Sequence, residues 1–135
     1  MPKEHIQPEE VFASQKFGYT QVVTSPPGKL IFLSGQVALD KNFQLVGKDD
    51  IGAQAGQALS NLGASLEAAG ARPSDVTSLR IYVAQYQPAD AAAVGPLLEK
   101  FFAGSPLPAQ TLLGVQTLAM PDLRIEIEAM AVVSD

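Results

Sequence analysis

Cysteine is absent from the 135 residues of this chain, and His5 is its single histidine. Without cysteine there is no disulfide framework, no thiolate nucleophile and no cysteine-based metal site. A lone histidine close to a chain end is far more often solvated than catalytic, because chain ends are the least ordered parts of most domains. His5 is therefore not a candidate catalytic residue.

Positive charge is also scarce. Nine Lys and Arg residues are scattered between Lys3 and Arg124, and the formal net charge is −5. A chain without a basic stripe has no surface for a phosphate backbone, so binding to nucleic acid is not expected. No run of 18 apolar residues and no apolar signal core occurs, which argues against a membrane partner. We expect a cytoplasmic protein.

The composition is that of one globular domain over residues 1–135. Hydrophobic residues make up 47% of the chain and charged residues 17%, and a chain of this length can bury a sizeable single core. This fraction of charged residues is too small to solvate a fully exposed surface well. Burial of part of that surface against other subunits is therefore plausible.

The apolar period predicts alternating strands and helices. A turn at Ser25–Gly28 is expected to join the first two strands into a hairpin. Asp49 or Asp50 can cap the first helix, and Gly70 can stop it. In the second helix, which begins near Pro88 or Asp90, Gly95-Pro96 is expected to cause a bend or a restart. The predicted strands are 18–24, 30–39, 76–84, 109–117 and 123–133, and the predicted helices are 51–69 and 88–102.

Strands that alternate with helices favour an α+β fold in which a mixed sheet carries both helices on one face. The other sheet face is then bare. Mixed polar and apolar residues on that face, such as Phe32, Ser34 and Gln36, suit a subunit interface that contains polar pockets.

The last predicted strand alternates charged and aliphatic side chains. Because strand side chains point to opposite faces in turn, Arg124, Glu126 and Glu128 are expected to share one face, while Ile125, Ile127, Ala129 and Ala131 pack inward. The charged face must meet water, a partner chain or a ligand. Arg124 and Glu126 stand about 6.5–7 Å apart along such a strand, so a salt bridge between them is the favoured interpretation, and a role for Arg124 as a cation of the site is the alternative.

Four segments carry a resemblance to a known family. They are Leu33-Ser34-Gly35-Gln36, Ala68-Ala69-Gly70 followed by Asp75-Val76, Pro108-Ala109, and Ile125 to Ala131. In order and spacing they resemble the RidA (YjgF/YER057c) superfamily over residues 18–133, which leaves residues 1–17 as an N-terminal extension. The resemblance implies a chorismate-mutase-like fold and a homotrimer in which the bare sheet faces form a barrel, with three small-molecule clefts between subunits.

The resemblance also implies a chemistry. Archetypal members hydrolyse reactive 2-enamino or 2-imino acids to 2-keto acids and ammonia, without a metal or cofactor. They use a glutamate in the last strand and an arginine after the Pro-Ala pair, which clamps the substrate carboxylate. Glu126 matches the glutamate, whereas Gln110 stands in place of the arginine.

Two smaller departures accompany that change. Gly95 stands where archetypal members often carry an asparagine, and the spacing from Gln110 to Glu126 is one residue longer than usual, with Ala119 or a neighbour as the insertion. A glutamine amide lacks the permanent charge and the bidentate fork of a guanidinium. The cleft is therefore expected to differ from that of the archetypal members.

The remaining candidates each have a structural alternative. Tyr19 covers the ligand or is a half-buried interface aromatic. Gly35 lets a ligand approach or only permits close packing. Glu126 and Glu128 could also be solvated charges or hydrogen-bonding groups along the trimer axis. The full set of predicted substrate-binding residues is Tyr19, Ser34, Gly35, Gln36, Gln110, Thr111 and Leu112, with Glu126 as the catalytic residue.

Two functions follow. The first is a divergent enamine/imine deaminase with an altered substrate, in which Glu126 orients water and Gln110 hydrogen-bonds an oxygen. The second is a non-catalytic trimer that binds a metabolite or regulates. A third possibility, an endoribonuclease, is a name attached to this family. The net negative charge of the chain, the missing cleft arginine and the lack of a catalytic histidine argue against an endoribonuclease.

Overall fold

The computed structural model describes residues 2–134. Two short 3-10 helices, η1 (Gln15–Phe17) and η2 (Pro73–Asp75), accompany the main elements of this part of the chain. The main elements, in chain order, are β1 (Glu4–Ile6), β2 (Val22–Thr24), β3 (Gly28–Val37), α1 (Ile51–Ala68), β4 (Val76–Ala84), α2 (Pro88–Phe102), β5 (Ala109–Val115) and β6 (Ile125–Ser134).

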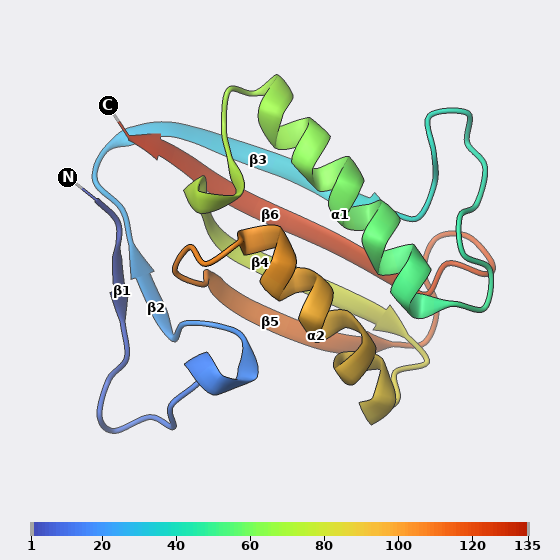
Figure 1. The fold of residues 1–135 in the computed structure, drawn as a ribbon, viewed down its shortest axis with the longest axis horizontal. Coiled ribbons are helices and arrows are strands. Elements are labelled where there is room, and N and C mark those ends of the chain that lie inside the picture. Colours follow the sequence, from blue (N-terminus) through green and yellow to red (C-terminus); the bar gives the residue numbers. More distant parts are fainter. Residues whose placement is uncertain (1, 135) are drawn as a thin grey trace.

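A mixed four-stranded sheet forms the body, with strand order β3-β6-β4-β5. β6 is antiparallel to both β3 and β4, whereas β4 and β5 are parallel and joined through α2. Both helices cover the same face of this sheet (Figure 1). The predicted α+β arrangement, with two helices on one face of a mixed sheet, is confirmed.

The core lies between that face and the helices. Ile125, Ile127, Ala129 and Ala131 of β6 are buried there as predicted, against α1 side chains such as Leu62. Burial of each large aliphatic side chain contributes roughly 1.5–3 kcal/mol. Among the described residues no helix is both long and apolar enough to cross a bilayer.

Gln54 is a polar residue in the buried stripe of α1 that the apolar pattern did not indicate. Its amide nitrogen donates to the carbonyls of Gly47 (3.2 Å) and Asp122 (2.8 Å), and its amide oxygen accepts from the backbone N–H of Arg124 (2.8 Å). A buried amide must be hydrogen-bonded to avoid a desolvation cost. Here those bonds tie the loops before α1 and before β6 to the helix.

The helix ends follow the predicted signals with one exception. Asp50, not Asp49, caps α1 by accepting a 3.0 Å hydrogen bond from Ala53, and Gly70 follows α1 with a φ of +77°. A bend or a restart was expected at Gly95-Pro96, and of these two the restart is wrong, because α2 continues through Pro96 to Phe102. A proline removes one intrahelical hydrogen bond, and the remaining bonds and the packing of α2 on the sheet keep the helix continuous.

The expected hairpin between the first two predicted strands is also wrong. β2 pairs with β1, an unpredicted strand that includes His5, and β3 pairs with β6. The β1–β2 pair is a separate ribbon beside the main sheet (Figure 1). The connection contains Pro26 and Pro27, which lack N–H groups and cannot form the hydrogen-bonded turn of a tight hairpin.

Candidate functional site

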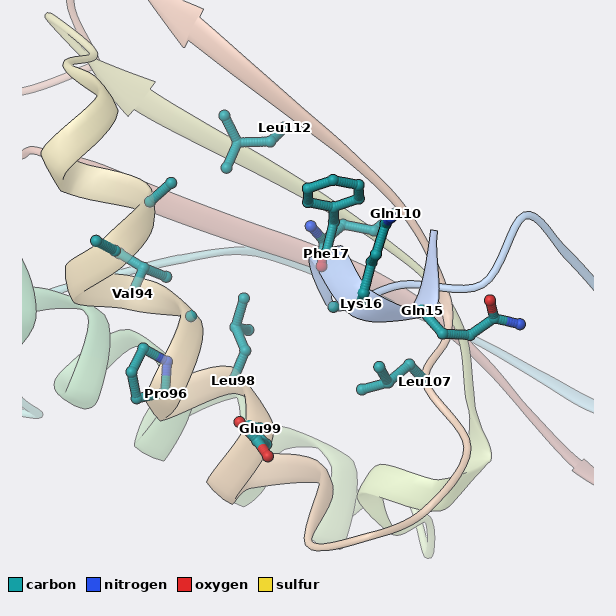
Figure 2. A pocket seen from close by; sticks show the side chains of 14 residues that line it. Gln15, Lys16, Phe17, Val94, Pro96, Leu98, Glu99, Leu107, Gln110 and Leu112 are labelled. Carbon is teal, nitrogen blue, oxygen red and sulfur yellow. The ribbon is translucent and has the colours of Figure 1, made fainter. Parts of the chain in front are cut away.

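A cavity of about 470 Å³ lies between η1, α2 and β5 (Figure 2). The register between β4 and β5 explains its position, because Gln110 is paired with the buried Leu79, and Leu112 is paired with the buried Ile81. Gln110 and Leu112 therefore face the helix side of the sheet. Apolar side chains dominate the cavity wall, and the charged or polar groups among its lining residues are Gln15, Lys16, Glu99 and Gln110.

Helix α2 supplies one wall of this cavity, and Gly95 leaves part of that wall without a side chain. A Cβ atom built on Gly95 would meet no other atom within 4 Å, so the glycine leaves open space where archetypal members often carry an asparagine. Pro96 has no N–H group, so the carbonyl of Ala92 lacks its usual intrahelical donor. Ala92 and Pro96 both line the cavity.

The segment η1 forms the opposite wall and was missed by the sequence reasoning. Lys16 and Phe17 line the cavity, and the Lys16 ammonium lies 5.5 Å from the centre of the Phe17 ring. These residues fall in the stretch treated as an N-terminal extension. The sequence did contain one sign that these residues lie near the site: they directly precede Gly18 and Tyr19, where the resemblance begins.

A second hollow of about 310 Å³ lies on the other side of Gln110. Tyr19, Gln110 and Thr111 line it together with Arg80. Three of the predicted substrate-binding residues thus meet at the start of β5, and Gln110 borders both cavities.

The other predicted residues lie around a β-bulge in β3, with Ser34 and Gly35 on the bare sheet face. Gln36 was expected on that face too, but it is paired with the buried Ile127, so the bulge turns it to the helix side. Between Leu33 and Gln36 the pairing with β6 shifts register, so Ser34 and Gly35 together stand opposite a single residue. The Glu126 carboxylate lies against this bulge: a Cβ atom on Gly35 would be 1.9 Å from Glu126 Oε2. Only glycine leaves room for the carboxylate in this position. Gln36 donates a 3.0 Å hydrogen bond to the Ser34 carbonyl.

Glu128 has a partner on the same bare face. The Tyr82 hydroxyl donates a hydrogen bond to Glu128 Oε1. This bond raises the pKa of Tyr82 above its ordinary value, and desolvation and the Glu128 charge act in the same direction. Glu128 is therefore engaged in a side-chain pair, whereas Glu126 faces the bulge.

Arg124 does not share the face of Glu126, contrary to the prediction. It precedes β6, and its guanidinium donates to Asp90 Oδ2 (2.8 Å) and to the Ala84 carbonyl (3.0 Å). Asp90 also accepts from the Gln87 N–H at the start of α2, so its carboxylate is preorganised to receive the guanidinium. The expected salt bridge with Glu126 is replaced by one that ties α2 to the end of β4.

Gln110 and Glu126 lie on opposite faces of the sheet within one chain. Gln110 faces the helix side, as its pairing with Leu79 requires, and Glu126 lies between the buried Ile125 and Ile127 and so faces away from the helices. The bare face also exposes large apolar side chains, with Phe32 71%, Leu30 58% and Leu113 45% exposed. Within residues 2–134, no group of three His, Cys, Asp or Glu side chains is placed to hold a metal ion.

Known proteins share this architecture. The family model described as Endoribonuclease L-PSP matches residues 13–133. A Dermatophagoides farinae protein named 2-iminobutanoate/2-iminopropanoate deaminase is 34% identical over 122 residues, which cover 90% of this chain and 91% of that protein.

Two solved structures superpose on the fold. A Yersinia pestis protein of unknown function from the conserved Rid family, YyfB, has a TM-score of 0.94 and 41% identity, covering 98% of this chain and 100% of that chain. The Escherichia coli YjgF gene product has a TM-score of 0.68 and 34% identity, covering 84% of this chain and 87% of that chain. The chain therefore belongs to the Endoribonuclease L-PSP family, the RidA (YjgF/YER057c) superfamily.

Proposed function

We propose that this protein is a cofactor-independent imine/enamine deaminase whose substrate selectivity differs from that of the archetypal RidA members. The observation that carries the proposal is the Glu126 carboxylate, which is retained and lies against the Ser34–Gly35 bulge. The relatives named as 2-iminobutanoate/2-iminopropanoate deaminases support the same chemistry.

The reaction needs one base and one water molecule. Glu126 accepts a proton from water as the water oxygen attacks the imine carbon and the C=N π electrons move to nitrogen, and Glu126 then returns that proton to the nitrogen. In the resulting carbinolamine, Glu126 takes the hydroxyl proton and passes it to the nitrogen as the C–N bond breaks, which releases ammonia and a carbonyl compound. An enamine substrate first takes up a proton at carbon and thereby becomes the imine.

A second chain completes the site. Because Gln110 and Glu126 lie on opposite sheet faces of one chain, a ligand can contact both only where two chains meet. The exposed apolar side chains of the bare face, led by Phe32, favour burial against other copies. We infer a homotrimer with small-molecule clefts between subunits, as the resemblance implies. Light scattering should give three times 14.2 kDa, and a mass of one chain would contradict the shared site.

The substitution at Gln110 sets the selectivity. Loss of a charge-assisted contact to a substrate carboxylate costs roughly 1.5–3 kcal/mol, or about ten- to a hundredfold in affinity. A glutamine amide can instead hydrogen-bond a neutral oxygen. A weaker preference for acidic substrates than in the archetypal members follows.

Ammonia release from freshly generated 2-iminopropanoate and 2-aminoacrylate tests the proposal. Wild type should be active, and Glu126→Ala should lose turnover because it removes the base. Glu128→Ala is the matched control, since it removes a carboxylate from the same strand face. Gln110→Arg should favour the acidic substrates. Equal activity in wild type and Glu126→Ala would contradict the assignment of the base.

A non-catalytic, metabolite-binding or regulatory trimer is the second candidate. The loss of the carboxylate-clamping arginine at position 110 favours it, while the cavity of about 470 Å³ remains. In that case wild type and Gln110→Arg would both release no ammonia. Glu126→Ala would then alter ligand binding or stability alone.

A further inference from the structure

Lys16 is a cation at the wall of the cavity that contains Gln110. Figure 2 shows its side chain extending from η1 toward Gln110 and the Phe17 ring. The 5.5 Å approach of the ammonium to the centre of that ring is a cation–π contact. This contact holds the charge beside the cavity and limits its freedom to extend into bulk water.

The Lys16 ammonium also lacks a competing carboxylate. In residues 2–134, the one side-chain ion pair within 4.0 Å joins Arg124 to Asp90. Glu99, the acidic residue that lines the same cavity, is on α2 rather than on η1. The Lys16 nitrogen therefore has hydrogen-bond donors available to an anionic ligand.

We propose that Lys16 binds the carboxylate of a 2-imino acid in this cavity, in place of the arginine that is missing at position 110. The inference rests on the proposed deaminase function and adds Lys16 to the residues that bind its substrate. The carboxylate contacts Lys16 and the Gln110 amide, and the aliphatic part packs on apolar wall residues such as Val94 and Leu112. The volume of about 470 Å³ is in the range of small-molecule pockets.

The strength of this contact differs from that of an arginine clamp. An ammonium is a strongly hydrated point charge without the bidentate fork of a guanidinium. Lys16 is also exposed, and water and salt weaken such a contact. Removal of the charge should therefore raise KM for a carboxylate substrate about two- to fivefold, with little change in kcat.

The experiment compares wild type with Lys16→Met, Lys16→Arg and Lys41→Met. Lys16→Met removes the ammonium but keeps an apolar stem, and Lys16→Arg restores a cation. Lys41→Met changes the net charge equally at an exposed residue outside the cavity. Two readouts are taken for each variant: steady-state ammonia release from 2-iminobutanoate, and binding of 2-oxobutanoate and its uncharged amide, 2-oxobutanamide, by NMR titration.

The expected result is a higher KM and weaker 2-oxobutanoate binding in Lys16→Met alone, recovery in Lys16→Arg, and no effect on amide binding. Wild-type turnover with identical KM values in all variants would overturn the Lys16 assignment and leave the deaminase proposal standing. A wild type that neither releases ammonia nor binds 2-oxobutanoate would overturn both. Binding without turnover that still depends on Lys16 would keep the carboxylate site and overturn the deaminase proposal.

Discussion

Replacement of Gly35 by alanine tests whether the bulge in β3 sets the position of the Glu126 carboxylate. The new Cβ atom would lie 1.9 Å from Oε2, whereas ordinary contact begins at 3.4 Å. The carboxylate oxygen must therefore move by about 1.5 Å, and a displacement of about 1 Å in a catalytic group can cost on the order of a hundredfold in rate. We expect kcat/KM for 2-iminopropanoate to fall about a hundredfold, or about 2.7 kcal/mol.

Stability should respond much less. The atoms within 3 Å of the new Cβ belong to the flexible end of Glu126, and Gly35 does not have a positive φ. A Gly→Ala change at such a position lowers the entropy of the unfolded chain, which offsets part of the repacking cost by roughly 0.4–1 kcal/mol. The midpoint of thermal unfolding should therefore stay within about 5 °C of wild type.

Gly56→Ala is the matched control for this experiment. A Cβ atom on Gly56 would meet nothing within 4 Å, and alanine in a helix interior is about 1 kcal/mol more favourable than glycine. Its activity should equal that of wild type. Full activity of Gly35→Ala would refute the link between the bulge and Glu126, and so would an activity loss that merely follows the unfolded fraction.

Three further results should follow from other contacts. Arg124→Ala should lower the free energy of unfolding in urea by about 1–3 kcal/mol, because the nearly buried Asp90 loses its ionic partner; a loss below about 0.5 kcal/mol would contradict this. Gly28→Ala should lower the free energy of unfolding by about 2 kcal/mol or more in the same assay, since its Cβ would lie 2.3 Å from a backbone oxygen of β6. A free energy equal to that of wild type would contradict this and show that the two strands move apart at little cost. The raised pKa of Tyr82 means that the stabilisation from its hydrogen bond to Glu128 is full below about pH 10 and is lost as pH rises through the folded-state pKa. An ultraviolet titration should show a late tyrosine ionisation that Tyr82→Phe removes; a titration curve in which Tyr82→Phe leaves the late step in place would contradict it.

The candidate site was only partly predictable from sequence. Glu126, Gly35 and Gln110 were predicted as site residues because they lie in family motifs whose spacing is visible along the chain. Lys16 carries no periodic signal, and it reaches the cavity only because the N-terminal segment folds back beside α2. Gln54 was hidden for a related reason: its partners, Gly47 and Asp122, lie in loops far apart in the chain.

The sequence by itself determined the two main helices, the four strands of the main sheet and the buried face of β6. The alternation of Ile125, Ile127 and Ala129 with charged residues specifies which side packs inward, because side-chain direction in a strand depends on position alone. The tertiary structure decided which segments meet. In the folded chain β2 pairs with β1 instead of β3, and Arg124 forms its salt bridge with Asp90. Gln110 lies on the sheet face opposite to that of Glu126. Those choices depend on pairing and packing between distant segments, which the local period of a single sequence does not encode.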